Sequence, residues 1–183
     1  VRRDTLMGVL WPDLPQESAQ TNLRQTLYRL RKTIPKLAQR NGEGTVPFLL
    51  ADRQTVQINL DGRFHLDVHQ FRELLKSEES HWPEATALYR DNFLTDFYLP
   101  DSAPFEEWAA SQRSALLRQA LDALDRLTAR RLETGELDAA ETYARRQLEL
   151  DNLRESAHRQ LMEVLVRNGR RRAALTHYET CRQ

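Results

Sequence analysis

The sequence has little of what marks secreted, membrane-spanning or zinc-stapled proteins. Cys181 is the single cysteine in 183 residues, so the chain can form no internal disulfide, and the Cys and His set typical of a structural zinc site is missing. No apolar run approaches the roughly 18 to 20 residues of a membrane helix, and the N-terminal residues 1–4 have no apolar signal core. The chain has only 6 glycines and 30% charged residues, a composition that favours helices. We expect a mainly α-helical cytoplasmic protein of one large or two small domains, with no membrane partner.

Charge is distributed unevenly along the chain, although the net charge is zero. Residues 1–40 hold eight basic and three acidic residues, a net charge of +5. Residues 41–183 hold 19 basic and 24 acidic residues, a net charge of −5. A basic end on an otherwise acidic chain indicates one part that binds a polyanion and one part that does not.

The basic end has the pattern of two helices joined by a tight turn. Residues 5–10 predict a short helix that ends at Trp11, because a residue before proline is disfavoured in the α region. A second helix is predicted over 15–34, just before Pro35. Its apolar residues recur at helical spacing. The expected buried stripe consists of Ala19, Leu23, Leu27, Leu30 and Ile34.

The opposite face of helix 15–34 carries amide, hydroxyl and guanidinium groups, which read base edges and bind phosphates. Two apolar or β-branched runs, 46–51 and 55–60, predict a hairpin with Arg53 at its tip. Two helices and a hairpin match the second half of a winged helix-turn-helix, with helix 15–34 as recognition helix. The alternative is a solvated basic helix on an ordinary domain. The predicted DNA-binding residues are Thr21, Asn22, Arg24, Gln25, Tyr28, Arg29, Arg31, Lys32 and Arg53.

The remainder predicts a helical array with a degenerate internal repeat. Helices are expected over 68–75, 83–89 and 105–133, the first capped by Asp67 and the last preceded by Ser102. The string GELDAA at residue 135 recurs 34 residues later as GRRRAA, and 34 is the tetratricopeptide period. Such arrays bind proteins or pack against neighbouring domains. The register predicts a helix-packing set of Leu137, Ala140, Ala144, Leu148, Leu150, Ala157, Leu161 and Leu165.

We find no pattern of a catalytic or cofactor site, and predict neither enzymatic activity nor a cofactor. His65 and His69 are four residues apart, but a cap at Asp67 places His65 before the helix, so no metal site is predicted. Cys181 occupies a small-residue packing position and is expected to be a buried structural thiol. The large aromatic residues are expected to pack, Trp11 between the first two helices and the others against the long helix. These others are Trp82, Phe93, Phe97, Tyr98 and Trp108.

Several strings resemble known families in combination. RDTL at residue 3, LWPD at residue 10 and AQTNLRQTLYRLR at residue 19 resemble the winged-helix part of SARP-type bacterial transcriptional regulators. LYRDNFL at residue 88, FYLPDS at residue 97, FEEW at residue 105 and QLELDNLRE at residue 147 are similar to the bacterial transcriptional activator domain (BTAD). That domain is tetratricopeptide-like and follows an OmpR-type winged helix. Asp91-Asn92 departs from the family's usual Gly-Glu, and Asn152 from its usual proline.

The resemblance implies a DNA-binding transcriptional regulator in two parts: 1–62, the C-terminal part of a winged helix-turn-helix, and 63–183, a BTAD. Its partners would be double-stranded DNA and, through the helical domain, a protein or a second copy of the chain. The family's winged helix has a sheet and a helix before the position of Arg3, so we expect a piece of a longer regulator whose apolar stripe lacks part of its cover. The alternative is a non-DNA-binding interaction or signal-relay module of a larger protein.

Overall fold

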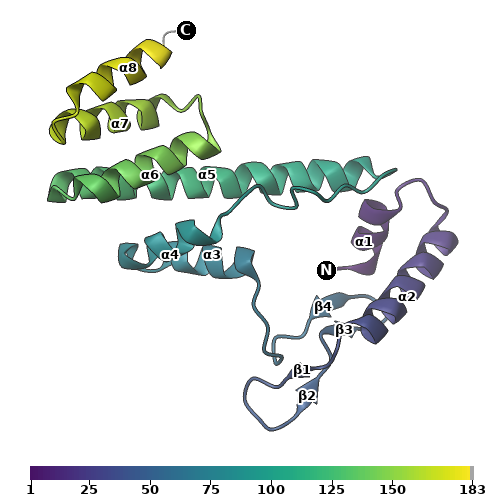
Figure 1. Ribbon diagram of the computed structural model, residues 1–183. Coiled ribbons are helices and arrows are strands. Elements are labelled where there is room, and N and C mark those ends of the chain that lie inside the picture. The colour runs from purple at the N-terminus through teal and green to yellow at the C-terminus, as the bar shows by residue number, and fades with distance from the viewer. Residues whose placement is uncertain (182–183) are drawn as a thin grey trace. The chain divides into compact units, whose positions relative to one another are not determined.

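The computed structural model describes residues 1–181, which form eight α-helices, one short 3-10 helix and two small β-hairpins (Figure 1). The predicted mainly α fold is confirmed. The chain divides into two compact units. The first contains Val1–Leu66 and Asp96–Ser111, and the second contains Asp67–Thr95 and the residues from Gln112 onward. The first unit therefore includes a segment, Asp96–Ser111, that lies far along the sequence from the rest of it.

Two helices form the centre of the first unit, α1 (Arg3–Leu10) and α2 (Gln16–Thr33). The Trp11 amide donates to the Met7 carbonyl at 2.8 Å and closes α1 just before Pro12, as the sequence predicts. Both predicted helices are confirmed to within two residues. Their shared core buries Met7, Ala19, Leu23, Leu27 and Val56, and Trp11 packs against it as expected.

The predicted hairpin consists of β3 (Leu49–Ala51) and β4 (Val56–Ile58), antiparallel with Leu49 opposite Ile58. Its turn is held by the Asp52 carboxylate, which accepts from the amides of Gln54 and Thr55 at 2.7 Å each. The loop 39–44 connects the strands of a second hairpin, β1 (Leu37–Ala38) and β2 (Thr45–Val46), which was not predicted. Its strands are two residues long, too short for an alternating pattern to appear in the sequence.

Helices make up the rest of the chain, and two of them begin at a residue whose side chain caps the helix. Asp67 accepts from the Val68 amide at 2.7 Å where α3 begins. Ser102 accepts from the Phe105 amide at 3.2 Å and so caps α5, as predicted. The Ser102 hydroxyl also donates to the Val9 carbonyl, which joins the start of α5 to α1 within the first unit. The elements are α3 (Asp67–Lys76), η1 (Glu79–His81), α4 (Trp82–Leu88), α5 (Ala103–Thr134), α6 (Leu137–Leu150), α7 (Glu155–Arg167) and α8 (Arg171–Cys181).

The predicted packing set forms the core of the last helices. Five of its members are buried, Ala140, Ala144, Ala157, Leu161 and Leu165. The other three, Leu137, Leu148 and Leu150, are half-buried. Small residues at these positions let α6, α7 and α8 approach closely.

A polar side chain lies in the middle of this core. Gln147 on α6 is fully buried, and its amide nitrogen donates to the Thr128 hydroxyl at 3.0 Å and to the Gln160 amide oxygen at 2.9 Å. Thr128 in turn donates to the Leu124 carbonyl. One network therefore joins α5, α6 and α7.

Three of the aromatic residues expected to pack are exposed, and that expectation is wrong for them. Phe97 is 50%, Tyr98 69% and Trp108 44% exposed. Phe97 packs edge-on and Trp108 at a tilt against the buried Phe105 ring, each at a centroid distance of 5.6 Å, and these contacts leave much of their own surface exposed. Within residues 1–181 the structure has no helix with the length and apolar character needed to cross a membrane.

Candidate nucleic-acid interface

Helix α2 has one buried and one open face, as its sequence predicts for the first three turns. Ala19, Leu23 and Leu27 are 3 to 7% exposed and face the core. The predicted contact residues lie on the other side. Asn22 is half-buried, and the rest are exposed: Thr21, Arg24, Gln25, Tyr28, Arg29, Arg31 and Lys32.

The apolar stripe of α2 is less complete than predicted. Leu30 is 37% exposed and Ile34 half-buried, so the prediction that both are buried is wrong. The side chains that cover Leu27 do not extend to the last turn. A cavity of about 220 Å³ lies there, lined by Leu30, Ile34, Phe48 and Leu49 among others.

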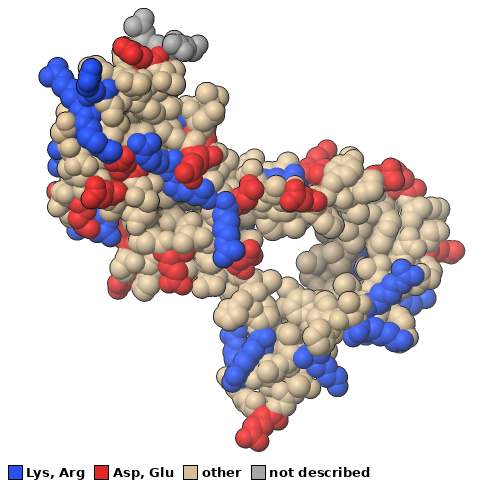
Figure 2. All heavy atoms as spheres, in the orientation of Figure 1, with Lys and Arg blue, Asp and Glu red and all other residues tan. Residues whose placement is uncertain are grey.

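Five cations of α2 and of the β3–β4 turn have no ion-pair partner in the part of the chain that the structure describes. Among residues 1–181, none of Arg24, Arg29, Arg31, Lys32 and Arg53 has a carboxylate within salt-bridge distance. All eight ion pairs of the described residues join side chains of the second unit. Figure 2 accordingly shows Lys and Arg gathered over α2 and the hairpins, and both signs mixed over the helical array.

Three arginines from separate elements converge beside α2. Arg3 of α1, Arg24 of α2 and Arg53 of the hairpin turn line one cavity of about 240 Å³, together with Asp4 and Gln20. The Arg3 Nε is buried and has no hydrogen-bond partner. Guanidinium groups in such an arrangement suit an oxyanion such as a DNA phosphate, which can accept from several of them at once.

The hairpin is held beside α2 by backbone and side-chain contacts. The Arg3 amide donates to the Gln54 carbonyl at 2.8 Å, and the Arg31 guanidinium donates to the Ala51 carbonyl at 3.4 Å. The amides of Gln54 and Thr55 lower the pKa of the Asp52 carboxyl below its ordinary value, because their hydrogen bonds favour the ionised carboxylate. Arg53 is thereby presented at an ordered tip.

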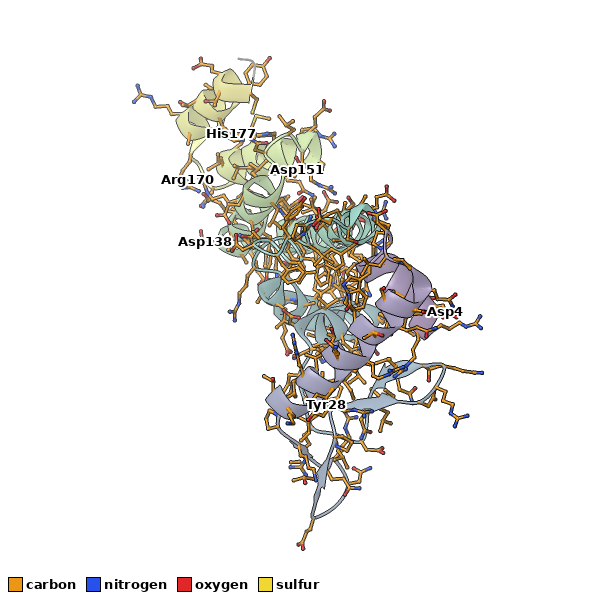
Figure 3. The ribbon with its side chains drawn as sticks, turned by 90° about the vertical axis from the view of Figure 1, so that its right-hand side faces the viewer. Asp4, Tyr28, Asp138, Asp151, Arg170 and His177 are labelled. Carbon is orange, nitrogen blue, oxygen red and sulfur yellow. The ribbon has the colours of Figure 1, made fainter. Side chains whose placement is uncertain are left out.

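Tyr28 lies on the outer face of α2 and is 60% exposed (Figure 3). The Lys32 ammonium sits 4.8 Å from the centre of this ring. This cation–π contact holds the Lys32 side chain along the surface of α2, where Lys32 remains exposed and can bind a ligand.

A family model described as the bacterial transcriptional activator domain matches residues 66–183. The matched region is more than half of the chain. The chain belongs to this family. No curated protein matches it. The BTAD region contains α3 to α8, whereas α1, α2 and the hairpins lie before it, so DNA binding by the predicted contact residues stays a prediction.

The BTAD region exposes several apolar side chains at its C-terminal end. Leu153 is 82%, Val166 54%, Leu175 55% and Tyr178 49% exposed. Single exposed apolar residues are common, but α8 alone presents two of these four. The surface of α8 is therefore a candidate for contact with a further protein segment.

The BTAD region also holds a cluster that the sequence analysis missed. Cys181 is exposed, so its prediction as a buried thiol is wrong, and it lies beside His158 and His177. Burial, followed by the charges of His158 and Arg145, lowers the pKa of His177. The four-residue spacing of His177 and Cys181 was the one signal in the sequence, since His158 comes from another helix.

Proposed function

We propose that this chain is part of a SARP-type transcriptional regulator that binds double-stranded DNA through its first unit. Helix α2 lies in the major groove as the recognition helix of a winged helix-turn-helix, and the β3–β4 hairpin contacts the backbone or minor groove. The BTAD region, as a tetratricopeptide-like array, contacts a protein partner or a second copy. The whole acts in the cytoplasm and performs no catalysis.

The observation that carries the proposal is the contrast in charge pairing between the two units. Seven arginines of the BTAD region each have a carboxylate within salt-bridge distance, for example Arg131 with Glu136 at 2.6 Å. The cations of α2 and the hairpin have no such partner among the described residues. Unpaired cations on one face attract a polyanion, and DNA binding rests mainly on neutralised phosphates.

The outer face of α2 also has the side chains that base reading needs. Gln25 can form two hydrogen bonds with adenine, and Thr21 can reach either a base edge or a sugar. The Thr21 hydroxyl donates to the Glu17 carbonyl at 3.0 Å. The lone pairs of the Thr21 hydroxyl oxygen remain exposed to solvent. Arg24 and Arg53 then contact the DNA backbone on either side of Thr21 and Gln25.

The second candidate function is an interaction module that does not bind DNA. It uses only the exposed apolar residues of α8, such as Leu175 and Tyr178, and needs no contact by the first unit. Both functions predict protein contact through the BTAD region, so only the first unit distinguishes them.

A DNA titration with charge-matched variants tests the proposal. The double variant Arg24→Ala/Arg29→Ala removes two unpaired cations, and Arg130→Ala/Arg167→Ala removes two exposed arginines that pair with Glu133 and Glu163. Fluorescence anisotropy with a labelled random duplex is expected to show at least about tenfold weaker binding for the first double variant only. Circular dichroism checks that both are folded. Equal affinities for the two variants, or no binding by the parent chain, would favour the interaction module.

A further inference from the structure

Three metal-ligating side chains meet between α7 and α8, the last two helices of the BTAD region. His158 lies on α7, and His177 (Figure 3) and Cys181 lie on α8. The Nδ1 of His158 is 2.9 Å from the Nε2 of His177 and 3.2 Å from the Sγ of Cys181. All three potential ligand atoms lie within 4.8 Å of one another. Two imidazoles and one thiol thus converge on a single point.

A backbone contact sets the orientation of the His158 ring. Its Nε2 lies 2.9 Å from the Asn152 carbonyl oxygen, and because a carbonyl only accepts, Nε2 carries the hydrogen. On a neutral ring Nδ1 is then the nitrogen with a free lone pair, and it is the atom that faces His177 and Cys181. Histidines that bind metals characteristically donate their second N–H to a carbonyl or carboxylate in this way.

Two of the three separations are close to those of a tetrahedral site, and the third, between His177 and Cys181, is within 4.8 Å. With metal–nitrogen bonds of about 2.0 to 2.1 Å and a metal–sulfur bond of about 2.3 Å, ligand atoms lie about 3.3 Å (N to N) and 3.6 Å (N to S) apart. The observed separations of 2.9 and 3.2 Å differ from these by a few tenths of an ångström. Small side-chain rotations would therefore admit an ion.

The donor set selects the kind of ion. A thiolate with two imidazoles suits a borderline cation such as Zn²⁺, whereas Mg²⁺ and Ca²⁺ take oxygen ligands. Cys181 is exposed, so an ion can enter from solvent and a water can complete the coordination. Arg145, the nearby cation, is paired with Glu141 at 2.8 Å, a carboxylate that it shares with Arg170.

We propose that His158, His177 and Cys181 bind one Zn²⁺ ion, which joins α8 to α7. Helix α8 is the last helix described, and among the described helices its main packing partner is α7. An ion held by ligands from both helices would make the docking of α8 dependent on metal.

Zinc titration of the reduced, metal-stripped chain tests this site. Competition with a chromophoric chelator is expected to show one Zn²⁺ per chain, and Zn²⁺ is expected to raise the melting temperature. Cys181→Ser and His158→Gln should each weaken zinc binding by at least about tenfold. The control His65→Gln removes an exposed histidine elsewhere and should bind zinc like the parent.

Cobalt substitution reports on the ligands without depending on stability. Co²⁺ should produce thiolate-to-cobalt charge-transfer absorption in the parent chain and in His65→Gln, but not in Cys181→Ser. Absence of these bands in the parent, or zinc affinities that are equal for the parent and Cys181→Ser, would overturn the proposal and leave an ordinary hydrogen-bonded cluster.

Discussion

Gly135 and Gly169 lie 34 residues apart and hold the same left-handed backbone conformation, with φ of 77° and 74°. Each ends a helix with the same bond across the turn. The Glu136 amide donates to the Arg131 carbonyl at 2.9 Å, and the Arg170 amide donates to the Leu165 carbonyl at 2.8 Å. The repeat in the sequence is thus a repeat of turn geometry as well as of apolar positions.

Replacing either glycine by alanine should destabilise the chain by about 1 to 2 kcal/mol, because an L side chain is disfavoured at positive φ. No atom lies within 4 Å of a Cβ built at either position, so the cost comes from the backbone alone. Gly8 is the matched control, since it also has open space but lies inside α1. Gly8→Ala should stabilise by about 0.5 to 1 kcal/mol. Urea unfolding measures all three, and a Gly135→Ala chain as stable as the parent would contradict this account of the turn.

Gln147 gives a second stability prediction, because its buried amide joins three helices. Gln147→Met keeps the volume but leaves the Gln160 amide oxygen without its donor, which should cost about 1 kcal/mol. Gln147→Glu should cost about 3 kcal/mol or more at pH 7, where a carboxylate would be buried without a cation. Burial raises the pKa of such a carboxyl above its ordinary value of about 4.3, so the loss should shrink as the pH falls from 7 toward about 4. Denaturant unfolding of the parent and of Gln147→Glu at pH 7 and at about pH 4 checks this. A loss of stability that is the same at both pH values would contradict it.

Local signals predicted the helices well because their causes lie within a few residues. The caps at Asp67 and Ser102 act on amides one and three residues away, and the break at Trp11 depends on the next residue. The end of α1 and the starts of α3 and α5 follow from such contacts. Residues of α2 that face solvent also follow from helical periodicity alone.

Features that depend on distant contacts were not predicted. Leu30 belongs to the same periodic stripe as Leu27. Whether Leu30 is buried depends on how far the distant segment 47–49 covers the last turn of α2. The exposure of Trp108 and Tyr98 depends on how much surface Phe105 and its neighbours offer. His158 and Cys181 are 23 residues apart, so their meeting requires the packing of α7 on α8.

Sequence-specific and sequence-independent contacts on α2 should separate by mutation. Gln25→Ala should lose about 1 to 3 kcal/mol of binding free energy at the chain's preferred site, found by selection from random duplexes, and little on random DNA. Arg29→Ala should weaken both about equally, since phosphate contacts carry no sequence information. Anisotropy titrations with both duplexes at one salt concentration make the comparison. Equal losses for both variants on both duplexes would mean that α2 does not read sequence.

The central claim, that unpaired cations of the first unit bind DNA phosphates, is tested most directly by the salt dependence of affinity. With about four to six phosphate contacts, log affinity should fall against log salt with a slope of order −4 to −5. Arg24→Ala should make the slope shallower by about one unit, whereas Arg167→Ala, which removes a paired arginine of the BTAD region, should leave it unchanged. A flat slope for the parent chain, or the same change for both variants, would contradict the claim.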